Sequence, residues 1–159
     1  MTTPSLRQIL PRLRVFLASA LTVSVAWEIL QTPLYRGTTL VYGVYTQASL
    51  LEPQYWVVLA YAALCDVFYI ALIYLCVALF TRDFLWLSKP LKTGTVFFMI
   101  LLSLAVAELI ELRGLHSGHW SYSALMPMVP ALGIGWFPFV QLAVTGFVSL
   151  YVTRRLNGI

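Results

Sequence analysis

Four apolar stretches, each about as long as a membrane-crossing helix, constrain this chain more than any other feature of its sequence. They cover residues 13–34, 54–80, 91–112 and 134–153. A helix rises about 1.5 Å per residue, so about 20 apolar residues cross the roughly 30 Å of hydrocarbon in a bilayer. Because the stretches fill most of the 159 residues, the sequence predicts one domain, an all-α integral membrane protein built as a bundle of four transmembrane helices.

The composition supports the same class. Hydrophobic residues make up 60% of the chain, charged residues only 10%, and the mean hydropathy is +0.85, whereas soluble proteins contain roughly 25% charged residues. The basic balance, with a pI near 9.3, comes from cations beside the apolar stretches. We therefore interpret it as a topology signal, and we expect the lipid bilayer rather than nucleic acid as the partner.

The positions of Lys and Arg predict the orientation. Eight of the ten lie in the amino-terminal region, the second connection or the carboxyl end: Arg7, Arg12, Arg14, Arg82, Lys89, Lys92, Arg154 and Arg155. The other two connections hold only Arg36 and Arg113. Because cytoplasmic segments carry the excess of cations, both termini should be cytoplasmic.

Prolines set several expected boundaries. Pro4 and Pro11 argue against a long helix before residue 13, and Pro33 should close the first span. Residues 36–53 should then form a loop that is too short and too polar to cross a membrane.

The connection before the last span raises a separate question. Gly114 to Gly135 should be a loop, and Pro138 fits a helix only in its first turn, so the last helix should begin near Phe137. Residues 124–136 would then be apolar non-helical chain. At membrane depth such a segment needs a cover of protein, and the sequence leaves open whether it is re-entrant.

Two cysteines exclude one class of enzyme. Cys65 and Cys76 lie eleven residues apart on one expected helix, which corresponds to about 16 Å and is too far for a disulfide. Four-helix redox enzymes that need a close cysteine pair are therefore excluded.

Three of the four carboxyl groups inside the spans are the strongest functional signal. Glu28, Asp66 and Glu108 lie on the first, second and third spans, and a carboxylate in hydrocarbon costs a few kcal/mol or more, so such residues commonly mark functional sites. Counting the helical rise from the expected ends places all three, with Gln141 of the fourth span, in the outer half of the membrane. We expect them to converge on one pocket.

Helical spacing extends each of these residues into a stripe. The stripes are Ser24, Glu28 and Gln31 or Thr32; Ala62, Asp66 and Tyr69; Ala105, Glu108 and Glu111; and Gln141, Thr145 and Ser149. We predict that they face a cavity that opens outward and is roofed by residues 116–122. The alternative is that the polar residues only form interhelical hydrogen bonds that set helix register.

Residues near the outer end of the third span have competing interpretations. Glu111 and Arg113 could pair at the membrane interface or meet lipid headgroups, and Trp120 and Tyr122 could be interfacial anchors, like Trp136, rather than substrate contacts. His116 and His119, with Glu111, are a weak alternative as metal ligands, because their spacing matches no established metal site. We predict no metal.

Two short patterns resemble known enzymes. Trp27-Glu28 at the end of the first span, with Asp66-Val67 in the second, resembles the opening of membrane-bound terpene cyclases of fungal meroterpenoid and indole-diterpene pathways and their bacterial relatives. That resemblance implies a membrane carboxyl group that protonates an alkene or epoxide. These enzymes are generally longer, with more helices.

A second pattern comprises Glu108, Gly118, Trp120-Ser121-Tyr122, Pro130 and Gly135, and it is similar in spacing to membrane carotenoid hydratases. No acidic residue follows Glu111, and Gln141 stands in the last span instead. The whole chain also resembles a group of small bacterial four-helix membrane proteins, which implies the bacterial inner membrane but no function.

Two classes of function follow. The first is an acid/base enzyme, an isomerase, cyclase or hydratase of an isoprenoid or other lipid-like substrate, which needs no cofactor. Glu28 and Glu108 would donate and accept the proton, and Asp66 would orient them. The substrate-binding residues would be Trp27, Gln31, Tyr69, Trp120, Tyr122 and Gln141. The second class is a non-enzymatic subunit of a membrane complex or a small transporter, in which the carboxyl groups bind a cation, protons or a partner. The partner could be a second copy of the chain, as in a homo-oligomer, or another protein of a membrane complex.

Overall fold

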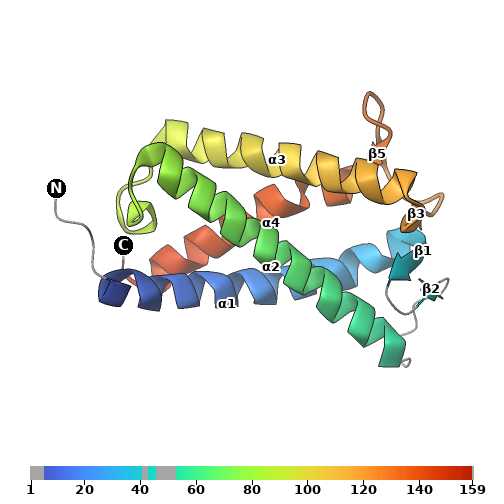
Figure 1. Ribbon diagram of the computed structural model, residues 1–159, viewed down its shortest axis with the longest axis horizontal. Helices are drawn as coiled ribbons and strands as arrows, with labels where there is room; N and C mark the ends of the chain where they lie inside the picture. The colour runs from blue at the N-terminus through green and yellow to red at the C-terminus, as the bar shows by residue number, and fades with distance from the viewer. Residues whose placement is uncertain (1–5, 41–42, 46–52, 159) are drawn as a thin grey trace.

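Four long helices form the molecule, a computed structural model that describes residues 6–40, 43–45 and 53–158 (Figure 1). They are α1 (Leu6–Gln31), α2 (Pro53–Thr81), α3 (Thr93–His116) and α4 (Trp136–Leu156). Each is long and apolar enough to cross a membrane. The predicted number of span-length apolar helices is confirmed, and the helix ends differ from the predicted ones by only a few residues, except at the start of α1.

The helices pack as a bundle in which neighbours in sequence are neighbours in space. Helix α1 packs against α2 and α4, and α3 packs against α2 and α4. Helix α2 runs obliquely across the bundle, and the two termini lie at the same end (Figure 1). The common end for both termini agrees with an even number of spans.

Proline has a different effect in the first and the last helix of the chain. Helix α1 begins at Leu6 and contains Pro11, so the prediction that no long helix precedes residue 13 is wrong. Near a helix start the first amide groups have no partner inside the helix, so Pro11 removes only one hydrogen bond just beyond them. Pro138 lies in the first turn of α4, which begins at Trp136, as predicted.

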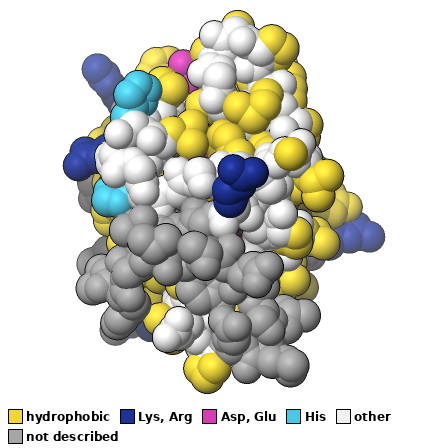
Figure 2. Space-filling model, turned by 90° about the vertical axis from the view of Figure 1, so that its right-hand side faces the viewer, with side chains coloured by type: hydrophobic (Ala, Val, Ile, Leu, Met, Phe, Trp, Pro, Cys, Tyr) yellow, Lys and Arg dark blue, Asp and Glu magenta, His cyan; other side chains and the backbone are white. Residues whose placement is uncertain are grey.

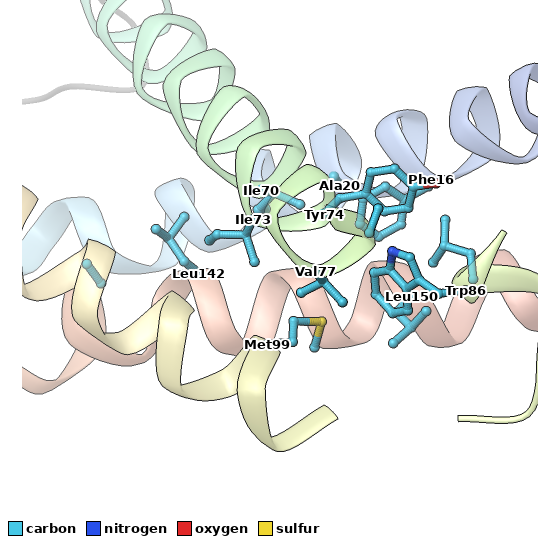
Figure 3. Close-up of a cluster of buried hydrophobic side chains, with 13 residues drawn as sticks. Phe16, Ala20, Ile70, Ile73, Tyr74, Val77, Trp86, Met99, Leu142 and Leu150 are labelled. Atoms are coloured by element: carbon cyan, nitrogen blue, oxygen red, sulfur yellow. The ribbon is translucent and has the colours of Figure 1, made fainter. Parts of the chain in front are cut away.

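A cluster of apolar side chains fills the bundle near the end that carries the termini (Figure 3). Tyr74 stacks on Trp86 with ring centroids 5.5 Å apart and lies 5.6 Å from the ring of Phe16. The Tyr74 hydroxyl donates a hydrogen bond to the carbonyl of Phe84 at 2.8 Å. Trp86 belongs to the short 3₁₀ helix η2 (Trp86–Ser88) between α2 and α3. The α2–α3 connection is thereby tied into the core.

Short strands close the other end of the bundle. Strands β2 (Gly43–Tyr45), β1 (Tyr35–Leu40) and β3 (Trp120–Tyr122) form an antiparallel sheet in that order, after the 3₁₀ helix η1 (Thr32–Leu34). Strands β4 (Met128–Val129) and β5 (Ile134–Gly135) form a second pair.

The expectation of plain loops at 36–53 and 114–135 is therefore wrong for the described residues, although residues 41–42 and 46–52 lie outside them. Tyr35 pairs with Tyr122 and Thr38 with Trp120, partners too far apart in sequence for a local pattern to reveal. Met126, Val129 and Ile134, between β3 and α4, are buried.

Cys65 and Cys76 are both free thiols, as predicted.

Candidate functional site

Three helices bring four polar side chains together inside the bundle, near the end that carries the strands. Glu28 and Gln31 come from α1, Asp66 from α2 and Gln141 from α4; we call these four residues the polar cluster. Gln31 and Gln141 are only 3% and 5% exposed. Glu28 and Gln31 face inward together because they lie about one helical turn apart.

Hydrogen bonds join all four residues. The Gln141 Nε2 donates to Glu28 Oε1 at 2.6 Å and to Asp66 Oδ2 at 2.5 Å. The Gln31 Nε2 donates to Glu28 Oε1 and to Gln141 Oε1, both at 2.8 Å. The Trp27 Nε1 donates to Gln31 Oε1 at 2.9 Å. Each amide nitrogen carries two hydrogens, so the N–H groups of Gln31 and Gln141 all donate within the cluster.

The charge balance of the polar cluster is its most informative property. Its hydrogen-bond donors are neutral amides and an indole, and no cationic side chain among the described residues bonds to it. Glu28 and Asp66 lie close together, because both carboxyl groups accept from the same Gln141 Nε2. Two adjacent carboxyl groups without a cation beside them share a proton more readily than they both ionise. The cluster is therefore suited to holding a proton.

A third carboxyl group lies beside the cluster on α3. Glu111 is buried, with 6% exposure, and its Oε2 accepts hydrogen bonds from the Trp120 Nε1 at 3.1 Å and from the Tyr122 hydroxyl. Trp120 can reach it because its ring lies directly over Gly114, where a Cβ atom would come within 1.9 Å of the ring. Strand β3 therefore supplies both donors to Glu111.

Two tyrosines lie near the Glu111 carboxyl group at this end. Burial raises the pKa of Tyr35 well above its usual value, and the nearby carboxyl groups of Glu111 and Glu28 raise it further. Burial and the hydrogen bond to Glu111 raise the pKa of Tyr122 in the same way. The two rings lie 5.5 Å apart. Both phenols stay protonated, so neither serves as a base at neutral pH.

The sequence-based prediction of this site is partly matched by the geometry. Glu28, Asp66, Gln31 and Gln141 come together as expected, and the stripe of α4 is buried at Gln141, Thr145 and Ser149. Tyr69 instead packs against the apolar core, with its ring 5.6 Å from that of Phe68. Trp27 lies at the edge of the cluster, with its ring centroid 6.2 Å from that of Phe137.

The predicted stripe of α3 is wrong. The buried residues of this helix are Met99, Ser103, Ala107, Glu111 and Gly114, whereas Ala105 is exposed and Glu108 is half-buried. Because each residue turns a helix by about 100°, Glu108 lies to one side of the buried face. No hydrogen bond joins it to another described residue. The structure does not bring Glu108 to Glu28 and Asp66, and Glu111 is the α3 carboxyl group closest to the predicted role.

The competing interpretations of the α3 end are also resolved in part. Arg113 is exposed while Glu111 points inward, so the expected Glu111–Arg113 pairing is wrong. His116 and His119 are exposed as well, and His116 Nδ1 lies 2.7 Å from the Leu112 carbonyl. Within the described ranges, no three His, Cys, Asp or Glu side chains come together as a metal site.

Figure 2 shows the face of the molecule at the strand end. Cationic and histidine side chains stand out on the described part of that face, and almost no acidic side chain reaches it. Two cavities lie elsewhere. One of about 10 Å³ is lined by core residues including Trp86 and Ser103, and one of about 390 Å³ is lined by Pro11, Arg12, Leu85 and Asn157.

Sequence reasoning missed Tyr35 altogether. Tyr35 lies after the helix break at Pro33, so no helical spacing in the sequence places it near Glu28. Only the pairing of β1 with β3 reveals its position beside Tyr122.

Comparison with known proteins finds no matching family model, no matching curated protein and no matching solved structure. The architecture itself defines the class: a small helical bundle with four candidate membrane spans and an interior carboxyl cluster. The resemblances to terpene cyclases and carotenoid hydratases remain expectations, and function must be argued from the site.

Proposed function

We propose that the polar cluster is the acid/base site of a membrane-embedded enzyme, an isomerase, cyclase or hydratase of an isoprenoid or other lipid-like substrate. One observation carries this proposal: the half-buried Glu28 and Asp66 carboxyl groups share the donor Gln141 Nε2, and their donors among the described residues are neutral amides. In a low-dielectric site two adjacent carboxyl groups share a proton rather than both ionise. The pair is thus a proton source that needs no cofactor.

The chemistry follows from that source. The protonated member of the pair transfers its proton to one carbon of an alkene, whose π electrons form the new C–H bond and leave a carbocation on the other carbon. Loss of a proton from a neighbouring carbon to a carboxylate returns the proton and yields an isomer. A ring forms when the π electrons of a second alkene in the same substrate first attack the carbocation and form a C–C bond, after which the new carbocation loses its proton in the same way. Capture of the cation by water, followed by loss of a proton, yields an alcohol. Trp27 and Trp120 are the aromatic groups beside the carboxyl groups that can stabilise a cation.

The amides have a defined part in this mechanism. Gln141 donates to both carboxyl groups, so it holds them together and stabilises the carboxylate that remains after proton transfer. Gln31 fixes Gln141 through its own Nε2. Glu111, held by Trp120 and Tyr122, is a neighbouring carboxyl group that can accept the returning proton.

Solvent deuterium tests this function. The protein in lipid nanodiscs is incubated in D₂O with linear polyenes (farnesol, squalene or lycopene), and mass spectrometry measures deuterium at carbon. We expect incorporation by the wild type, and a loss of about 100-fold or more in Glu28→Gln and Asp66→Asn, the size typical of a lost general acid. Asp83→Asn is the matched control, because Asp83 pairs with Lys89 outside the site. Incorporation that persists in both variants contradicts the proposal.

A second candidate function is supported by a separate observation. The side chains of the polar cluster satisfy one another. A site of this kind suits a bound proton or cation in a transporter or in a subunit of a membrane complex. If wild-type protein adds no deuterium to any polyene, yet takes up protons into liposomes in a way that Glu28→Gln abolishes, this alternative replaces the enzyme.

For localisation, we propose a multi-pass protein of the bacterial inner membrane with both termini in the cytoplasm. The support is the excess of Lys and Arg at the end of the bundle that carries the termini. A reporter fused after residue 159 that is active only outside the cytoplasm would contradict this orientation.

A further inference from the structure

The cavity of about 390 Å³ lies at the end of the bundle that carries the termini (Figure 1). Its described walls come from three parts of the chain: Pro11 and Arg12 from α1, Leu85 from the α2–α3 connection, and Asn157 from the end of α4. Sites for small molecules have volumes of about 300–1,000 Å³, so this cavity is large enough for a ligand. We call it the terminal cavity.

Hydrogen bonds between the three parts of the chain fix the walls of the terminal cavity. The Arg12 Nη1 donates to the Ser88 Oγ at 2.5 Å, which joins α1 to the 3₁₀ helix η2. The Arg154 Nη1 donates to the carbonyls of Leu87 and Lys89 at 3.1 and 2.6 Å, which joins α4 to the same connection. The cavity is therefore preformed by contacts within the bundle.

The charge around the terminal cavity is strongly positive. Residues 6–14, 82–92 and 154–157, which form this end, contain eight Lys and Arg residues but a single acidic one, Asp83. The Asp83 carboxylate already pairs with Lys89. Arg12 is half-buried on the cavity wall, and its bond to Ser88 uses only one of its several N–H groups. The cavity therefore presents a guanidinium group that no carboxylate neutralises, which suits an anion.

The depth of the terminal cavity identifies a membrane lipid as the source of that anion. Pro11 lies just inside the start of the candidate span Ile9–Leu34, and Asn157 directly follows the candidate span Trp136–Leu156. The cavity thus lies where the helices leave the hydrocarbon, which is the level of the lipid headgroups. Basic pockets between transmembrane helices at this level bind anionic headgroups.

We propose that the terminal cavity binds the phosphate of an anionic phospholipid, with the Arg12 guanidinium as its cationic ligand and the Asn157 amide as a second donor. A guanidinium can hold a phosphate through two parallel N–H bonds. The Asn157 Nδ2 donates to the Thr153 carbonyl at 2.6 Å and has a second hydrogen to donate. The acyl chains lie on the apolar surface next to the cavity, where Leu10 is 45% and Leu156 70% exposed. This inference does not depend on the proposed acid/base chemistry, because the polar cluster lies near the other end.

Binding of short-chain lipids to the protein in neutral detergent micelles tests the site. Microscale thermophoresis measures the Kd at about 0.15 M salt, where distant exposed charges are screened. We expect saturable binding of dioctanoyl phosphatidylglycerol, and weaker binding of dioctanoyl phosphatidylcholine because its choline cation meets a cationic surface. Arg12→Gln should weaken the binding of phosphatidylglycerol about tenfold, the effect of one charged hydrogen bond. Arg14→Gln is the matched control: it removes the same charge from an exposed residue that does not line the cavity, and the Kd should stay within about twofold of wild type.

Two further measurements separate this site from its alternatives. Ser88→Ala removes the partner of Arg12 within the fold but keeps the cation, so this variant should bind phosphatidylglycerol nearly as wild type does. Glycerol 3-phosphate has the phosphate without acyl chains and should bind far more weakly than the lipid. The proposal is overturned if Arg14→Gln or Ser88→Ala weakens binding as much as Arg12→Gln does. It is also overturned if phosphatidylcholine binds as tightly as phosphatidylglycerol, or if glycerol 3-phosphate does, which would make the ligand a soluble phosphate compound.

Discussion

The two ends of this bundle are built from the same four helices by opposite means. Near the termini, Phe16, Tyr74, Trp86 and Leu150 fill the interior with apolar contacts that need no particular direction. Near the strands, the interior is held by directed hydrogen bonds among Glu28, Gln31, Asp66 and Gln141, together with the bonds of Trp120 and Tyr122 to Glu111. Packing therefore holds the helices together at one end, and directed hydrogen bonds hold them together at the other.

The membrane sharpens this difference. Between helices in lipid the hydrophobic effect contributes little, because lipid tails are as apolar as leucine, so the apolar end is stabilised mainly by close packing. A polar group at the other end has no water to return to. Removing one partner there leaves another polar group unsatisfied, which costs more than the bond itself contributed.

The largest effect is expected for Gln141→Leu. This change removes the donor shared by Glu28 and Asp66 and the acceptor of Gln31. It should lower the free energy of unfolding by about 3 kcal/mol, because several buried polar groups lose their partner. Titration with a denaturing detergent in mixed micelles measures it.

The control for this variant is Thr145→Val one turn away, since the Thr145 hydroxyl bonds only to the carbonyl of Gln141. If Gln141→Leu were no more destabilising than Thr145→Val, the cluster would not be an energetic unit, and the contrast between the two ends would fail.

A smaller effect is expected for Leu150→Ala at the apolar end. Leu150 is fully buried in the core, and its truncation leaves a cavity that costs about 2 kcal/mol. This value is the low end for such changes, because in a membrane the variant loses packing contacts but little hydrophobic transfer free energy. Infrared bands of the carboxyl groups should stay at their wild-type positions. A shift of those bands would show that the two ends are coupled. Leu156→Ala, at a 70% exposed position, is the matched control.

The smallest effect is expected for Asp83→Asn, outside both regions. Its Oδ2 accepts from the Lys89 Nζ at 2.5 Å, but the Lys89 side chain is 59% exposed. Exposed ion pairs contribute about 0.2–1 kcal/mol, so the unfolding free energy should fall by less than about 1 kcal/mol. The loss should shrink further at high salt. A larger loss would add the α2–α3 connection to the elements that hold the apolar end.

Particular residues show how far sequence reasoning reached. The four spans, the first-turn position of Pro138 and the meeting of Glu28 with Asp66 all follow from local patterns: apolar length, proline chemistry and the depth of each carboxyl group. The start of α1 and the strands did not, because Pro11 is tolerated near a helix start and β1 pairs with β3 across most of the chain.

What the sequence alone determined is the class of the molecule and the position of each polar group along its helix, since both follow from the length of apolar runs and the rise of a helix. Only the tertiary structure decided which groups meet. Rotation of α3 about its axis, set by its packing on α4 and by Trp120 over Gly114, turns Glu111 inward and Glu108 aside. Depth is a property of one helix, whereas facing direction depends on its neighbours.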